Sequence, residues 1–301
     1  MASSPAPHSV PGPHAIDNNA HENTTLEDDT LEKPNTFRKR AGSFSTARLL
    51  GPVVKDHGDL PLLACCFVTG LVDAAAFSNW GVFVGMQTGN TVMLGLSTAG
   101  LPANPHAWLT TLVSIASFLL GAFLTFRVSN LIAPKGPTTN RLWAGSLFLL
   151  QGICILVAAA LATPHGLIPQ NPGSTGRNVR EPEWVLEDVR IVSLLPPLAF
   201  QSGMQIATSK LLGFNELPVN VLTSTYCDIM GDFKLLALNN VRGNRRVAAA
   251  VLLLIGAISS GWLMRSSAGL KGVLWISCGI KILTGVGMWL FLPAADGATL
   301  P

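Results

Sequence analysis

Residues 107–127 read AWLTTLVSIASFLLGAFLTFR, a run of 20 uncharged and mostly apolar residues that ends at Arg127. A helix needs roughly 20 such residues to cross about 30 Å of hydrocarbon. This run therefore predicts a membrane-spanning helix, and the chain contains eight apolar segments of this kind. They lie at 60–80, 82–100, 107–127, 143–163, 190–209, 218–238, 246–265 and 272–292.

The composition agrees with a lipid environment. Of 301 residues, 49% are hydrophobic and 12% are charged, about half the charged share of an ordinary soluble domain. We predict an all-α, polytopic helical membrane protein. The net charge of +3 is small and the basic residues are scattered, which argues against a nucleic-acid partner. The five cysteines lack the spacing of a zinc site or a disulfide framework, so we expect neither a metal nor a cofactor.

The number of crossings depends on two segments, 82–100 and 218–238, which are the most polar of the eight. Lysine and arginine are retained on the cytoplasmic side of short loops. The charges fit about six crossings better, with these two segments entering and returning on one side and the N-terminal tail in the cytoplasm. Eight crossings are the alternative, and they weaken the charge bias.

The two halves of the chain share a pattern. Gly203 lies 133 residues after Gly70, and the motif at Thr223 lies 135 residues after the motif at Thr88. We therefore predict two related halves, which are inverted if there are six crossings and parallel if there are eight. The expected organisation is a disordered polar tail (1–58), a first membrane repeat (59–163), an exposed polar loop (164–189), a second membrane repeat (190–292) and a short C-terminal tail (293–301).

The second apolar segment contains the polar motif Gly81-Val-Phe-Val-Gly85-Met-Gln-Thr-Gly89-Asn-Thr91. Glycines four residues apart share a helix face, where they allow close helix contact while Thr and Asn bond across it. The alternative is a discontinuous helix whose free backbone groups and polar side chains meet a solute near the midplane. On the second interpretation the solute-binding residues are Gln87, Thr88, Gly89, Asn90, Thr91, Gln205, Thr223, Thr225 and Tyr226.

Charged residues inside the apolar segments are the candidates for ion or proton coupling: Asp73, Asp228, Asp232 and Lys281. Each costs roughly 2.5–3.5 kcal/mol on insertion scales unless it finds a partner or water. Asp228 and Asp232 are four residues apart and are expected to share one helix face. A structural ion pair, for example between Asp73 and Lys281, is the alternative.

Several motifs together resemble a known family. They are Gly70-Leu-Val-Asp73-Ala, Phe83-Val-Gly-Met-Gln-Thr-Gly-Asn-Thr91 with Gly95, Gly203-Met-Gln205, and Leu222-Thr-Ser-Thr225 followed by Asp228. Over about residues 58–292 the chain resembles the YoaK-like family, multi-pass membrane proteins that carry a domain-of-unknown-function label. The resemblance implies about six crossings and no established substrate. The long tail and the extended loop at 164–189 depart from the compact form of such proteins.

The leading hypothesis from the sequence is a small-solute transporter or permease built from two halves. A non-transporting scaffold or assembly partner, in which the same polar groups hold helices together, is the alternative. An enzyme is the third choice, because no nucleophile with a neighbouring base is apparent. The expected partners are the lipid bilayer and an unidentified small solute, and a homo-oligomer stays open.

Overall fold

A computed structural model describes residues 58–101, 106–134, 140–163, 189–214, 216–217, 219–234, 237 and 239–291. All of them belong to the larger of two compact units, Phe44–Pro301. Apart from Gly58 and Val189, the predicted tail (1–58), polar loop (164–189) and C-terminal tail (293–301) lie outside the described residues.

The described residues form helices and connections, with no strand among them. This confirms the predicted all-α class. The elements are α2 (Asp59–Trp80), α3 (Gln87–Ser97), α4 (Ala107–Ile132), α5 (Arg141–Leu161), the 3-10 helix η3 (Val189–Leu194), α7 (Leu195–Leu211), α8 (Thr223–Met230), α9 (Val241–Arg265) and α10 (Gly269–Phe291).

Five of these helices, α2, α4, α5, α9 and α10, are long and apolar enough to cross a membrane. The protein is therefore of the polytopic helical type. Helix α7 has 17 residues and follows directly after η3, and its place as a sixth crossing stays a prediction. Helices α3 and α8, with 11 and 8 residues, are too short to cross about 30 Å at 1.5 Å per residue.

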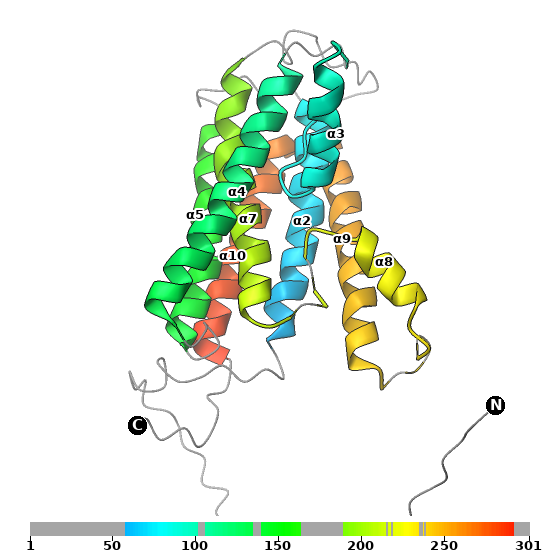
Figure 1. Cartoon of the computed structure of the whole chain (residues 1–301). Helices are drawn as coiled ribbons and strands as arrows, with labels where there is room; N and C mark the ends of the chain where they lie inside the picture. The colour runs from blue at the N-terminus through cyan, green and yellow to red at the C-terminus, as the bar shows by residue number, and fades with distance from the viewer. Residues whose placement is uncertain are drawn as a thin grey trace, which may run out of the picture. The chain divides into compact units, whose positions relative to one another are not determined.

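The long helices form a bundle in which three pairs make the closest contact: α2 with α9, α4 with α7, and α5 with α10 (Figure 1). Helices α2 and α7 run in opposite directions, as the colour gradient in Figure 1 shows. Buried apolar residues of α2, α5, α7 and α10 make the main core, so these four helices surround the centre of the bundle.

Two glycines allow two of these pairs to approach closely. A Cβ atom on Gly70 of α2 would lie 2.0 Å from the carbonyl oxygen of Leu253 in α9. A Cβ atom on Gly203 of α7 would lie equally close, 2.0 Å, to the carbonyl oxygen of Phe118 in α4. Any side chain there would force the helices apart, so both glycines are required by backbone contact.

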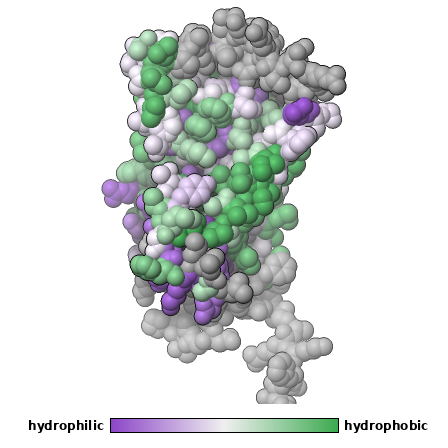
Figure 2. Space-filling model, turned by 90° about the vertical axis from the view of Figure 1, so that its right-hand side faces the viewer, coloured by the Kyte–Doolittle hydropathy of each residue, from purple (hydrophilic) through white to green (hydrophobic). Residues whose placement is uncertain are grey.

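The outer face suits lipid. Figure 2 shows hydrophobic side chains gathered across the middle of the face that carries α8 and α9. On α9 the exposed residues include Leu254, Ile258 and Trp262, of which Trp262 is 69% exposed. Lipid tails accept such residues, whereas a water-facing helix would expose polar side chains.

The glycine contacts give a testable prediction. Gly70→Ala and Gly203→Ala are each expected to destabilise the protein by about 1–3 kcal/mol, because a backbone must move to admit the methyl group. Gly261→Ala is the matched control, since a Cβ there meets nothing within 4 Å and alanine favours a helix by up to about 1 kcal/mol. Thermal unfolding of the purified chain in detergent measures all three. Equal melting temperatures for the three variants would contradict this account of the helix contacts.

Candidate functional site

The segment after α2 forms a hairpin that turns back into the bundle. Helix α2 ends at Trp80, and Gly81 takes the left-handed conformation (φ 63°) that starts the turn. The N–H groups of Val84 and Gly85 then donate to Oδ1 of Asp73 over 2.8 and 2.7 Å. Asp73 lies seven residues, or about 10 Å, before the end of α2. Residues 81–86 therefore turn back alongside α2, and the number of crossings stays a prediction.

Asn90 holds this first hairpin together. Its Oδ1 accepts from the N–H of Phe83 (2.9 Å), and its Nδ2 donates to the carbonyl oxygen of the same residue (2.6 Å). The Asn90 amide also donates to Gln87 and Ser114, while Thr91 donates to the carbonyl oxygen of Gln87. The Asn90 side chain is fully buried by these contacts. Its observed contacts are structural, and its predicted role in solute binding stays untested.

The segment after α7 forms a second hairpin. The chain leaves α7 at Leu211 and returns to Asn220, whose Nδ2 donates to the carbonyl oxygen of Ser202 in α7 (3.1 Å). Oδ1 of Asn220 accepts from Thr69 (2.9 Å) and Gln205 (2.7 Å). Val219, just before this tip, has φ 38°, a strained conformation for a β-branched residue. Such strain persists only where surrounding contacts enforce it.

The tips of the two hairpins meet. A Cβ atom on Gly85 would lie 3.4 Å from Nδ2 of Asn220 and 2.8 Å from Oδ2 of Asp73. Only glycine lets the first tip fit between these two side chains. Oδ2 of Asp73 has no hydrogen-bond partner among the described residues, although Asp73 is only 2% exposed.

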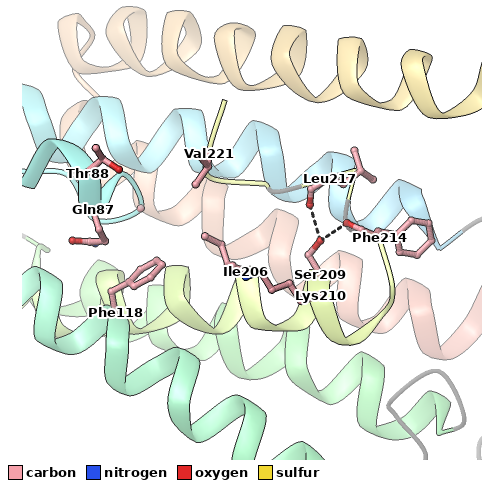
Figure 3. Close-up of a pocket in the computed structure, with 10 residues that line it drawn as sticks. Gln87, Thr88, Phe118, Ile206, Ser209, Lys210, Phe214, Leu217 and Val221 are labelled. Carbon is pink, nitrogen blue, oxygen red and sulfur yellow. Dashed lines mark hydrogen bonds between the residues drawn. The ribbon is translucent and has the colours of Figure 1, made fainter. Parts of the chain in front are cut away.

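A cavity of about 400 Å³ lies beside this junction (Figure 3). Its walls come from the first hairpin, from α4 and α7, and from the connection between α7 and α8. Ser209 of α7 fixes that connection by donating to the carbonyl oxygens of Leu217 (2.6 Å) and Phe214 (3.2 Å). The lining residues are Gly85, Gln87, Thr88, Phe118, Ile206, Ser209, Lys210, Phe214, Leu217 and Val221.

Lys281 lies fully buried on the other side of α7. Its ammonium group donates to Oε1 of Gln151 (2.6 Å), to Oε1 of Gln205 and to Sγ of Cys65 (3.1 Å). Gln205 in turn donates to Thr69 and Asn220, so the lysine is connected to the second hairpin. The predicted alternative of an Asp73–Lys281 pair is wrong, because backbone N–H groups hold the carboxylate and glutamines hold the ammonium.

The predicted solute-binding residues on α8 lie away from the cavity. On α8, Thr223 and Tyr226 are exposed, and buried Thr225 donates to the carbonyl oxygen of Val221. None of the three lines the cavity. Their predicted contact with solute stays untested.

The two remaining acids also lie away from the cavity. Asp228 pairs with Arg246 (3.2 Å). Asp232 lies beyond the end of α8 at Met230, so the expectation that it shares a helix face with Asp228 is wrong. A hydrogen bond from Asn240 (2.6 Å) and one from the backbone of Lys234 hold the pKa of Asp232 below its ordinary value. Asp232 therefore keeps its charge at neutral pH.

Sequence reasoning missed Asn220, Ser209, Lys210 and Gln151. Neutral polar residues are common in membrane helices, and a lysine at the end of an apolar segment, such as Lys210, commonly only fixes the topology. No group of three or more His, Cys, Asp and Glu residues that could hold a metal occurs in the described part of the chain.

Comparison with known proteins gave one match. The model of a family described as a protein of unknown function (DUF1275) matches residues 61–287. This agrees with the resemblance that the motifs carry. No curated protein and no solved structure matches the chain.

The contact between Asp73 and the first hairpin can be tested by substitution. Asp73→Ala is expected to leave the N–H groups of Val84 and Gly85 without an acceptor, whereas Asp73→Asn keeps one acceptor oxygen. Amide hydrogen exchange of residues 83–87 should accelerate strongly in the alanine variant and less in the asparagine variant. Unchanged exchange in Asp73→Ala would show that the carboxylate does not hold the tip.

Proposed function

The chain belongs to the DUF1275 family of proteins of unknown function, and on that premise we propose that it moves a small solute across the membrane. One observation carries the proposal: two hairpins enter the bundle from opposite ends (Figure 1) and meet beside a cavity whose lining includes polar side chains. Gln87 and Thr88, both expected to bind solute, belong to that lining.

The need to pair the backbone N–H and C=O groups of the hairpins favours transport over a scaffold. Non-helical backbone at membrane depth is tolerated only where protein buries it or where it lines a water-filled cavity. Each hairpin has dedicated side chains that satisfy its backbone, Asp73 and Asn90 in the first and Ser209 in the second. A protein that only holds helices together needs neither hairpin, because uninterrupted helices satisfy their own backbone groups.

A relation between the two halves supports the same function. Each half has a long helix, a hairpin with a short helix, and two further long helices. Their glycine contacts also correspond. A Cβ atom on Gly121 would lie 2.2 Å from the carbonyl oxygen of Phe200, and one on Gly256 would lie 2.2 Å from that of Phe67. Gly256 follows Gly121 by 135 residues, and Phe200 follows Phe67 by 133. Inverted repeats of this kind are the architecture of many secondary transporters.

Within the proposal, Asp73 couples the solute to a proton. Its free Oδ2 lies against Gly85, which also lines the cavity. A proton on Asp73 weakens its hydrogen bonds from Val84 and Gly85, since a neutral carboxyl is a poorer acceptor than a carboxylate. Protonation therefore loosens the first hairpin next to the solute. Asp228 is a weaker candidate because Arg246 neutralises it.

Accessibility of the cavity from both sides of the membrane tests the proposal. In a cysteine-free background, a single cysteine replacing Thr88 is expected to react with a membrane-impermeant thiol reagent added to either side of reconstituted vesicles. Alternating access requires this result. A cysteine replacing fully buried Ala158 is the control and should not react from either side. Reaction of the Thr88 position from one side only, or from neither, would favour the scaffold.

Coupling through Asp73 has its own test. With Cys227, which is exposed on α8, restored as a second cysteine, the labelling rate at the Thr88 position divided by that of Cys227 is expected to rise as the pH falls. The Cys227 rate serves as an internal reference for the reagent at each pH. In an Asp73→Asn background the ratio should not change with pH. A ratio that varies equally in both backgrounds would exclude Asp73 as the coupling group.

A further inference from the structure

We propose that the solute is a small organic anion with an apolar body, and that Lys210 binds its charged group. This inference rests on the proposed function and names the class of molecule that the cavity receives. It follows from how charge and apolar surface are distributed around the cavity in Figure 3.

The cavity wall has an apolar part and a polar part. Phe118 from α4 and Ile206 from α7 contribute apolar surface, and Phe214, Leu217 and Val221 extend it along the connection to α8. Polar groups stand apart from this surface: the Gln87 amide and Thr88 hydroxyl belong to the first hairpin, and Lys210 belongs to α7 (Figure 3). Such a division fits a solute with an apolar body and a polar group at one end.

Lys210 is the one charged side chain among the described lining residues. In Figure 3 it extends along α7 toward Ile206. No hydrogen bond or ion pair of its ammonium group occurs within the described part of the chain. Glu216, the nearest acid in sequence, contacts Arg245 instead (3.2 Å), as does Asp59 (2.8 Å). Lys210 is exposed, so its ammonium group is accessible to an anion that enters the cavity.

A second lysine, Lys281, lies behind the same wall. Ile206 and Ser209 of α7 line the cavity. The residue before each of them, Gln205 and Thr208, faces the buried cluster around Lys281 on the other side of the helix. One helix, about 10 Å across, therefore separates the Lys281 ammonium from the cavity. Asp73 opposes the charge of Lys210 while ionised, because charges interact over such distances in low-dielectric surroundings. A proton on Asp73 leaves Lys210 as the charged group that an anion in the cavity would balance.

The test uses three probes with the same ring and different charge: benzoate, benzamide and benzylammonium. Calorimetric titration of the purified full chain in detergent is expected to give benzoate roughly tenfold tighter binding than the other two, the usual effect of one charge-assisted hydrogen bond. Lys210→Gln should reduce benzoate affinity to that of benzamide. Lys210→Arg should retain most of the preference, because it keeps the charge. Lys234→Gln, which removes an exposed lysine outside the cavity, is the matched control and should change nothing.

Three results would overturn the inference. They are equal or cation-favouring affinities in the wild-type chain, absence of binding by benzoate, and benzoate binding that Lys210→Gln leaves unchanged. Each of these leaves the proposed function standing if the Thr88 cysteine still reacts from both sides. One-sided labelling combined with preserved benzoate selectivity would instead contradict transport while keeping the anion site.

Discussion

Backbone hydrogen bonding in the absence of water is the constraint on which this structure depends. Long helices pair their own backbone N–H and C=O groups, but the non-helical connections after α2 and α7 cannot do so. Asp73 and Asn90 supply the missing partners in the first hairpin, and Ser209 supplies them in the second, while Asn220 ties the second hairpin to α7. Many of the polar side chains inside this bundle therefore form hydrogen bonds to the protein's own backbone, and only a few line the cavity.

This division separates the roles within the Gln87–Thr91 motif. Asn90, Thr91 and Gln87 form hydrogen bonds within their own hairpin. Gln87 also lines the cavity, together with Thr88. The motif is both a structural element and a candidate binding surface, and the two interpretations of its sequence are complementary. The corresponding motif on α8 differs, because Thr223 and Tyr226 are exposed on a short helix that contacts mainly α9.

The helices could be predicted because the length of an apolar run is fixed by membrane thickness. Segment 107–127 became α4, and 60–80 matches α2 within one residue. The positions of side chains within the bundle could not be predicted in the same way. Asp73 and Lys281 suggested a pair by charge alone, yet the order and rotation of helices placed other partners closer. Asn220 and Gln151 escaped notice because a neutral amide has no distinctive pattern in sequence.

The fit of Gly85 between Asp73 and Asn220 has a mechanical consequence. The two hairpins share one narrow contact, and each tip forms part of the support for the other. Displacing the first tip removes a neighbour of Asn220, and displacing the second exposes the carboxylate of Asp73. In the transporter that we propose, the two hairpins act as half-gates and this contact is an interlock, because one gate must stay in place while the other moves. Such an interlock would prevent both gates from opening at the same time.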